Sequence, residues 1–245
     1  MESDDFRVGV YVDGFNLYYG GRSLFGRGAS GWKWLDLRKL SERIIEQQCA
    51  WAAPDFLKIV YCSARVSGAE DPQKEIDQSI YIRALRESGS VDHFEFGSFR
   101  HRISYAPLAI QGKKNRPKIF SPTPPILIQT NAQDFIHDSR FIATIARWEE
   151  KGSDVNVASH LLIDCMSNRI DAAIVISNDS DLRLPIEKVV DQIPIGVINP
   201  SKNPTAGALR KLKGHNDQVF FYQLKQDDYL NCQLSYRDVR KPKDW

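Results

Sequence analysis

Three carboxylates directly follow two short apolar runs of the sequence. VGVYVDGFN runs into Asp13, and AAIVISNDSDL runs into Asp179 and Asp181. Continuous β-branched runs of this length are typical of buried strands in a parallel sheet, and ligands of open α/β sheets bind beyond the carboxyl ends of such strands. Carboxylates gathered there repel one another, and a divalent cation relieves that repulsion. The three residues therefore predict a metal site, whose oxygen ligands favour Mg2+ or Mn2+.

A simpler interpretation applies to each of these residues alone. Asp is common in turns after strands and at the first position of helices, where its side chain caps the backbone. For a single Asp this interpretation is as good as a metal ligand. For three carboxylates at one sheet edge, the metal site is the stronger hypothesis.

The composition is that of an ordinary globular protein. The chain has 245 residues, of which 42% are hydrophobic and 26% charged, enough for one large α/β domain or a core domain with a small extension. MESDDFR contains no apolar signal segment, and no apolar run reaches the roughly 18 residues of a membrane span, so we expect a cytoplasmic protein. The four cysteines form no CxxC pair and are expected to be reduced and buried: Cys49, Cys62, Cys165 and Cys232.

Two stretches of the chain carry cations without any acidic residue. The net charge of +2 says little, but basic side chains neutralise phosphates, and aromatic residues between them stack on unpaired bases. Both stretches therefore suit RNA or single-stranded DNA, and we predict single-stranded RNA as the partner; a solvated loop or exposed hairpin is the alternative for each stretch. The cations of 96–133 are Arg100, Arg102, Lys113, Lys114, Arg116 and Lys118, and those of 196–216 are Lys202, Arg210, Lys211 and Lys213.

The apolar pattern predicts alternating strands and helices. Pro-rich residues 100–130 interrupt the alternation and predict an inserted hairpin or long loop, and residues 226–245 predict an irregular tail. The expected strands are 8–12, 56–62, 91–99, 172–176, 195–198 and 219–224, and the expected helices are 34–48, 72–88, 139–148, 155–166 and 184–190.

Three segments in order, VYVDGFNLYYG, EKGSDVNVASHLL and DAAIVISNDSDLRLPI, resemble the signature blocks of the NYN domain in the PIN-like nuclease superfamily. The resemblance implies an α/β fold, a Rossmann-like, PIN-type three-layer sandwich with a central, mainly parallel sheet. The domain would cover 1–225, with the basic insertion at about 100–130. The implied activity is that of a metal-dependent ribonuclease, which hydrolyses RNA phosphodiester bonds with one or two bound cations.

The resemblance also assigns roles to individual residues. The expected catalytic residues, which would also hold Mg2+ or Mn2+, are Asp13, Asp154, Asp179 and Asp181. Asp154 has the competing interpretation of a helix cap. The expected substrate contacts are Asn16, Lys151, Ser177, Asn178, Lys113, Lys114, Arg116, Lys202 and Arg210.

Two positions depart from the family pattern. Asn178 stands where many relatives have Gly, and Asn tolerates left-handed backbone geometry well enough to keep the turn. His160 stands where an acid is expected. Because it follows Asp154 by six residues it does not share that residue's helical face, and we interpret it as a core histidine.

Other function classes were weighed against the ribonuclease. A scaffold that binds RNA or a protein without catalysis, with a homodimer as one possible assembly, remains the main alternative. A phosphatase with a D-x-D pair is disfavoured, because Phe15 stands where the second Asp would be. Nucleotide-binding oxidoreductases are set aside, because no G-x-G-x-x-G follows the first strand.

Overall fold

The fold is that of a computed structural model, which describes residues 5–48, 51, 53–66, 68, 71–113, 116–123, 126, 128–136, 139–212, 219–235, 238–243 and 245. The chain divides into two compact units. Unit 1 comprises Met1–Phe99 and Glu150–Trp245, and unit 2 comprises Arg100–Glu149.

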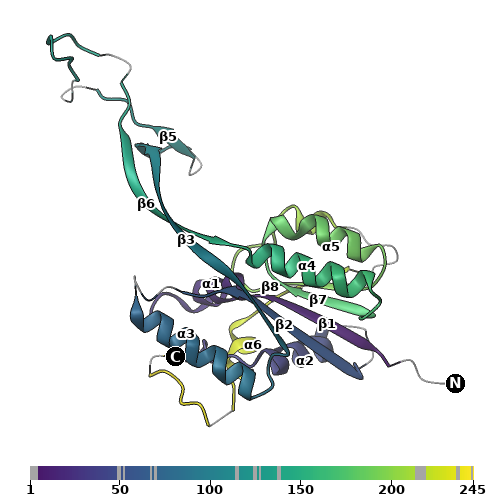
Figure 1. The fold of residues 1–245 in the computed structure, drawn as a ribbon. Helices are drawn as coiled ribbons and strands as arrows, with labels where there is room; N and C mark the ends of the chain where they lie inside the picture. Colours follow the sequence, from purple (N-terminus) through teal and green to yellow (C-terminus); the bar gives the residue numbers. More distant parts are fainter. Residues whose placement is uncertain are drawn as a thin grey trace. The chain divides into compact units, whose positions relative to one another are not determined.

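A seven-stranded sheet has the strand order β6-β3-β2-β1-β7-β8-β9 (Figure 1), and its strands from β2 to β9 in this order belong to unit 1. The pairs β3-β2, β2-β1, β1-β7, β7-β8 and β8-β9 are parallel. The α/β class with a mainly parallel central sheet is therefore confirmed. The strands are β1 (Arg7–Asp13), β2 (Phe56–Ala64), β3 (His93–Pro107), β6 (Ile142–Lys151), β7 (Ala172–Ile176), β8 (Ile195–Asn199) and β9 (Val219–Gln223).

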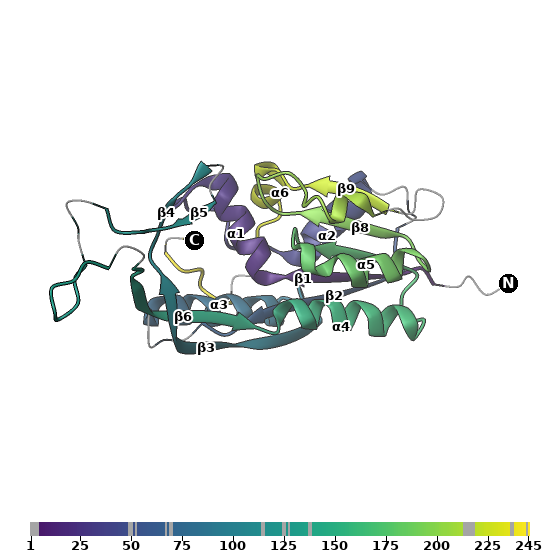
Figure 2. The ribbon, with the colours of Figure 1, turned by 90° about the horizontal axis from the view of Figure 1, so that it is seen from above.

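Helices flank both faces of this sheet (Figure 2). Neighbouring side chains of a strand point to opposite faces of the sheet. Alternate residues of each strand therefore belong to two different hydrophobic cores, one on each face. Val10 and Ile174 belong to the core under one set of helices, and Tyr11 and Val175 to the other. The first set is α1 (Gly14–Phe25), α2 (Leu37–Gln48), α3 (Pro72–Glu87) and α6 (Gln226–Asn231), and the second is α4 (Ser153–Met166) and α5 (Arg183–Val190).

The strand order reverses between β1 and β7. The chain leaves β1 toward β2 on one side, and leaves β7 toward β8 on the other. Such a topological switch point leaves a crevice beyond the carboxyl ends of the two strands, which is the usual ligand site of open α/β sheets. Asp13 ends β1, and Asp179 follows β7 by three residues, so the fold places both at this crevice.

Three expectations about the elements are wrong. The segment predicted as helix 139–148 is instead largely β6, because pairing beside β3 overrides the weak helical propensity of its Ile and Thr residues. The tail predicted as irregular contains α6. Helix α1 was not predicted, since Gly20 and Gly21 are poor helix formers. Both are needed for close packing, because a Cβ at Gly21 would lie 2.5 Å from the Trp32 ring.

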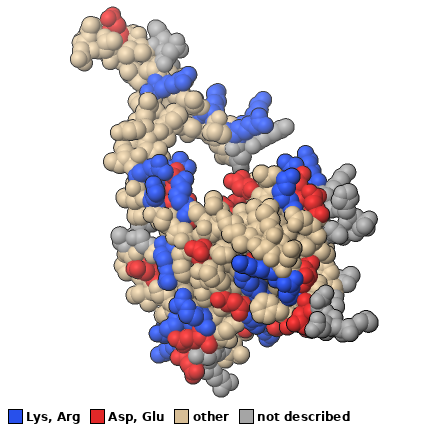
Figure 3. Space-filling view, turned by 45° about the vertical axis from the view of Figure 1, so that its right-hand side comes forward, with Lys and Arg blue, Asp and Glu red and all other residues tan. Residues whose placement is uncertain are grey.

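Unit 2 contains the outer part of β3, most of β6, and a small antiparallel pair, β4 (Ala109–Gln111) with β5 (Pro117–Ile119). Inside this unit His101 stacks on Trp148 with ring centroids 3.9 Å apart. On the face drawn in Figure 3, Lys and Arg side chains are interspersed with Asp and Glu over the larger body of the molecule. No helix among the described residues is long and apolar enough to cross a membrane.

Candidate functional site

A cavity of about 390 Å3 lies in unit 1 at the carboxyl ends of β1, β7 and β8. Its position is the switch point of the sheet, and its volume is within the range of sites for small molecules. The lining residues are Asp13, Phe15, Asn16, Tyr19, Gly20, Ser23, Glu150, Ser153, Asp154, Asn178, Asp179, Ser201 and Asn203.

Asp13 is the most buried acid of this cavity, with 2% of its surface exposed. One carboxylate oxygen accepts a hydrogen bond from the Asn16 backbone N–H at 2.9 Å and so caps α1, and the other accepts from Ser177 Oγ at 3.0 Å. Burial raises the pKa of Asp13 to about 7, helped by the charges of Asp154 and Asp179 and opposed by the two hydrogen bonds. Asp13 therefore exchanges its proton near neutral pH.

Asp154 lies in the first turn of α4, half-buried at the cavity wall. Burial raises its pKa to about 6, and the charges of Asp179, Glu150 and Asp181 add to this effect. Its carboxylate accepts no hydrogen bond from the described residues, and Ser153 Oγ beside it is buried without a partner in that same part of the chain. Both groups are thus available to a ligand.

Asn178 connects the loops that shape the cavity. Its backbone N–H donates to Asn16 Oδ1 at 2.9 Å, and its own Oδ1 accepts from the Ala206 N–H at 2.8 Å. The next residue, Asp179, accepts from the Asp181 N–H at 2.9 Å and donates its backbone N–H to Ser177 Oγ at 3.1 Å. These bonds fix the turn after β7, so the acids are held in position before any ligand binds.

One wall of the cavity is aromatic, which the sequence analysis missed. Phe15 and Tyr19, one turn apart on α1, stack with ring centroids 6.4 Å apart, and Phe99 meets Phe15 edge-on at 5.6 Å. Tyr19 is 56% exposed. A planar ligand could stack here, with the carboxylates opposite its polar atoms.

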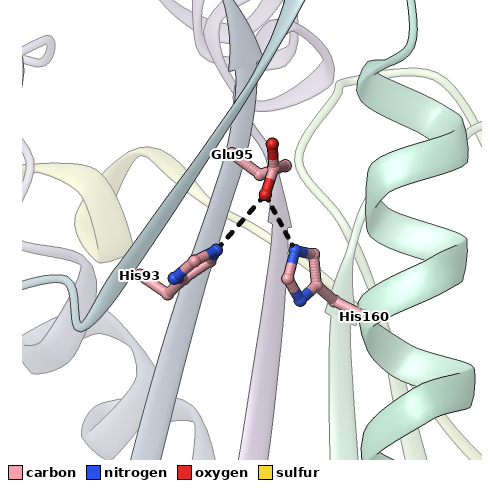
Figure 4. A group of neighbouring side chains, drawn as sticks. All are labelled: His93, Glu95 and His160. Atoms are coloured by element: carbon pink, nitrogen blue, oxygen red, sulfur yellow. Dashed lines mark hydrogen bonds and ion pairs between the residues drawn. The ribbon is translucent and has the colours of Figure 1, made fainter.

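A second cluster of titratable residues was also missed. Glu95 Oε2 lies 3.4 Å from His93 Nε2 and 3.3 Å from His160 Nε2 (Figure 4). The interpretation of His160 as a core histidine is therefore wrong, because the packing of α4 beside β3 brings its ring to Glu95. The spacing His93-x-Glu95 is the sequence pattern that could have predicted part of this cluster, because it places both side chains on one face of a strand.

The structure brings together the four predicted acids, with Asn16, Ser177 and Asn178 among them. Asp181 does not line the cavity but acts on Asp154 through its charge. The predicted cations are less concentrated. Lys202 follows the cavity residue Ser201, whereas Lys151, Arg210, Lys113 and Arg116 are exposed and not among the lining residues. Lys114 lies outside the described residues, as does Cys49.

Comparisons with known proteins give one named relative. No family model matches the chain. It is 26% identical over 273 residues, covering 100% of this chain and 77% of the relative, to the 6-hydroxy-3-succinoylpyridine 3-monooxygenase HspA of Pseudomonas putida. It is also similar to the crystal structure of a protein of unknown function from Vibrio parahaemolyticus, with 16% identity and a TM-score of 0.48 over 93% of this chain and 98% of that one.

The named relative overturns the predicted enzyme class. A monooxygenase is an oxidoreductase, whereas a ribonuclease is a hydrolase, so the prediction of a metal-dependent ribonuclease is wrong, and the prediction of Mg2+ or Mn2+ as its cofactor is wrong with it. The physical reason lies in the acids. The sequence shows that the acids gather at one edge but not how deeply they are buried, and burial is the main cause of the raised pKa values of Asp13 and Asp154. Acids at such an edge can hold protons as well as a cation, so their presence does not define the enzyme class.

Proposed function

We propose that this chain is a monooxygenase for a small hydroxylated aromatic or N-heteroaromatic compound, which binds in the cavity at the switch point of the sheet. The observation that carries the proposal is the similarity, along the whole chain, to a protein named as a monooxygenase of a hydroxypyridine compound. The lack of a G-x-G-x-x-G motif after the first strand argues against a dinucleotide-binding oxidoreductase. That motif marks one way of binding a nucleotide and does not define the class.

The cavity suits a substrate of this kind. The stacked rings of Phe15 and Tyr19 offer a surface for a planar ring, and Ser153 Oγ and the Asp154 carboxylate have no partner among the described residues. A ring hydroxyl or ring N–H donates to a carboxylate. The amide oxygens of Asn16 and Asn178 already accept hydrogen bonds within the loop network, so the acids are the free acceptors for these protons.

The acids also suit proton transfer. A general base works best with a pKa near the working pH, and Asp154 at about 6 and Asp13 at about 7 are both near it. Asp154 would accept the proton of the ring hydroxyl, which raises the electron density of the ring and favours attack by an electrophilic oxygen. Asp13, buried behind it, would hold a proton during turnover.

At a ring carbon that carries hydrogen, one atom of dioxygen forms a C–O bond to the carbon, and the hydrogen leaves as a proton. The other oxygen atom is reduced to water by two electrons and two protons. The electrons must come from a donor in solution, for which we propose a reduced nicotinamide.

We further propose that the scaffold is of the NYN, PIN-like type, without its nuclease activity. The support is that the three matching blocks supply β1 with α1, the start of α4, and β7 with its following turn, and that all three contribute to one cavity. Binding of RNA, a homodimer and a cytoplasmic location stay predictions.

The test is oxygen consumption by the purified full chain with reduced nicotinamide and a panel of rings. The panel is 6-hydroxy-3-succinoylpyridine, 2-hydroxypyridine and, as a ring without a hydroxyl group, benzoate. Separate arms add Fe2+ or a flavin. We expect dioxygen, nicotinamide and a hydroxylated ring to be consumed in equal amounts in at least one arm, and benzoate to be left unchanged. No consumption above the protein-free rate in any arm overturns the proposal.

A further inference from the structure

Three potential metal ligands meet on the face of the sheet that α4 covers. His93 and Glu95 lie two positions apart on β3, so their side chains point to the same face of the sheet. His160 contacts Glu95 from α4. Figure 4 shows both imidazole rings turned toward one Glu95 carboxylate oxygen. The two nitrogens and this oxygen all lie within 4.8 Å of one another.

The spacing of these atoms is close to that of a metal site. Imidazole nitrogens and carboxylate oxygens bind divalent transition metals at roughly 2.0 to 2.2 Å, so neighbouring ligand atoms on one ion are roughly 3 Å apart. The two nitrogen–oxygen separations, 3.4 and 3.3 Å, already approach this value. The two nitrogens lie within 4.8 Å of each other, and a rotation of the exposed His93 ring would be needed to bring them to this distance.

The site also has room for further ligands. The side chains of His93, Glu95 and His160 are 46%, 41% and 23% exposed. A metal held by three protein atoms needs open positions for water, substrate or dioxygen if it is to take part in a reaction, and these exposures leave such positions on the solvent side.

We propose that His93, Glu95 and His160 bind one divalent first-row transition metal ion. Imidazole ligands favour iron, nickel, copper and zinc, whereas Mg2+ favours oxygen ligands, and two His with one carboxylate is the ligand set of non-haem iron oxygenases. The assignment of Fe2+ in particular rests on the proposed monooxygenase function. The metal site itself rests on the ligand geometry alone.

The metal would lie beside the proposed substrate cavity. Asp13 is in register with Cys62 of β2, and Cys62 with Glu95 of β3. At about 4.8 Å between strands, the backbones of Asp13 and Glu95 are thus about 10 Å apart. On α4, His160 follows Asp154 by six residues, or about 9 Å at 1.5 Å per residue. The two sites are therefore neighbours, the cavity at the carboxyl edge of the sheet and the metal ligands on the face that α4 covers.

The alternative is a cluster held only by hydrogen bonds and ion pairs. Titration of the chelator-treated full chain with Co2+ separates the two, with visible absorption and calorimetry as readouts and no substrate present. We expect one equivalent to bind with an absorption band of mixed nitrogen and oxygen ligation. Because loss of an outer hydrogen-bond partner alone costs 10- to 100-fold in metal affinity, Glu95→Gln and His160→Gln should each weaken binding by more than about tenfold.

His101→Gln is the matched control, since it removes a histidine from unit 2 and should leave the Co2+ affinity unchanged. Circular dichroism melts show whether each variant is folded, and His93→Gln provides another removal if one of the others is not. Absence of Co2+ binding, or binding that the folded variants leave unaltered, overturns the site. That result would leave the proposed function standing if oxygen consumption persists, so the two failures are distinguishable. A nitric oxide adduct of bound Fe2+, seen by electron paramagnetic resonance, tests the iron assignment.

Discussion

The acidic cavity at the carboxyl edge of the sheet and the His93–Glu95–His160 cluster on the face covered by α4 differ in burial and in ligand type. In the cavity, Asp13 is 2% exposed, and all the titratable side chains that line it are carboxylates or the phenol of Tyr19. In the cluster, the side chains are 23 to 46% exposed and combine nitrogen with oxygen. Both sets contain residues that sequence patterns associate with metals.

The two sites differ in their titration because burial raises the pKa of carboxyl groups. Removing a carboxylate from water favours its neutral form, so the cavity acids become proton carriers with pKa values of about 6 and 7. The two imidazoles and the carboxylate of the cluster are more exposed, so they remain hydrated and can bind a cation. In this account the sheet edge provides the site for proton transfer, and the neighbouring sheet face provides the site for the metal.

The largest expected effect is on turnover. Asp154→Asn keeps the size of the side chain but removes the base, and general base catalysis contributes about 10²- to 10⁴-fold. We expect oxygen consumption with a hydroxylated ring to fall by that factor. Glu187→Gln is the control, because Glu187 lies on α5 in an ion pair with Arg183 away from the cavity lining. A variant Asp154→Asn with more than a tenth of the wild-type rate would contradict the role of Asp154.

The next effect is on the pH dependence of stability. The pKa of Asp13 rises from 3.8 to about 7 on folding, so between these values the folded state binds more protons than the unfolded state. The free energy of unfolding should therefore fall as pH rises from 4 to 7, by up to about 4 kcal/mol. Asp13→Asn should remove most of this decline. Urea unfolding of the wild-type protein and of Asp13→Asn at pH 5 and pH 7.5 measures this decline in the free energy of unfolding. An equal decline in the two proteins would contradict a buried, protonated Asp13.

A smaller effect tests whether the two sites are separate. Because Asp154 lies about 9 Å along α4 from His160, Asp154→Asn should change the Co2+ affinity by no more than about twofold, as expected for independent positions. The measurement is the same calorimetric titration used for the cluster. A loss of affinity as large as that of His160→Gln would mean that the acids themselves hold the metal, and the distinction between the two regions would break down.

The smallest expected effect concerns unit 2 and the predicted RNA partner. Lys113, Arg116 and Lys118 are exposed there, and each contact to a single-stranded phosphate contributes about 0.7 to the slope of log affinity against log salt. Replacing the three with Gln should lower the slope by up to about 2. Lys188→Gln on α5 serves as the control. If RNA binds with the same slope in the triple variant, unit 2 is not the RNA surface.

Sequence patterns were sufficient for six of the seven strands of the sheet and for Asp13, Asp154 and Asp179 in the cavity, but not for β6 or Glu150. Strands such as β1 and β7 are apolar over several consecutive residues because helices cover both faces of the sheet. A continuous apolar run of this kind can be recognised in the local sequence. The position of Asp13 and Asp179 at one edge then follows from the parallel topology.

The remaining features depend on contacts between distant residues. Glu95 meets His160 across 65 positions of the chain, through the packing of α4 on the sheet, which no local pattern records. The pKa of Asp13 depends on the depth of its burial. The enzyme class could not be predicted because carboxylates at a switch point serve a metal or a proton equally well, and only burial and partners distinguish the two.

The reaction that we propose for this chain is the insertion of one oxygen atom into a hydroxylated ring. The most direct measurement is mass spectrometry of the product formed under ¹⁸O₂ from 6-hydroxy-3-succinoylpyridine, with the purified chain, Fe2+ and reduced nicotinamide. We predict one ¹⁸O atom in each product molecule, and at least about 100-fold less labelled product from Asp154→Asn over the same time. Unlabelled product, or unchanged substrate with the wild-type chain, would contradict the claim.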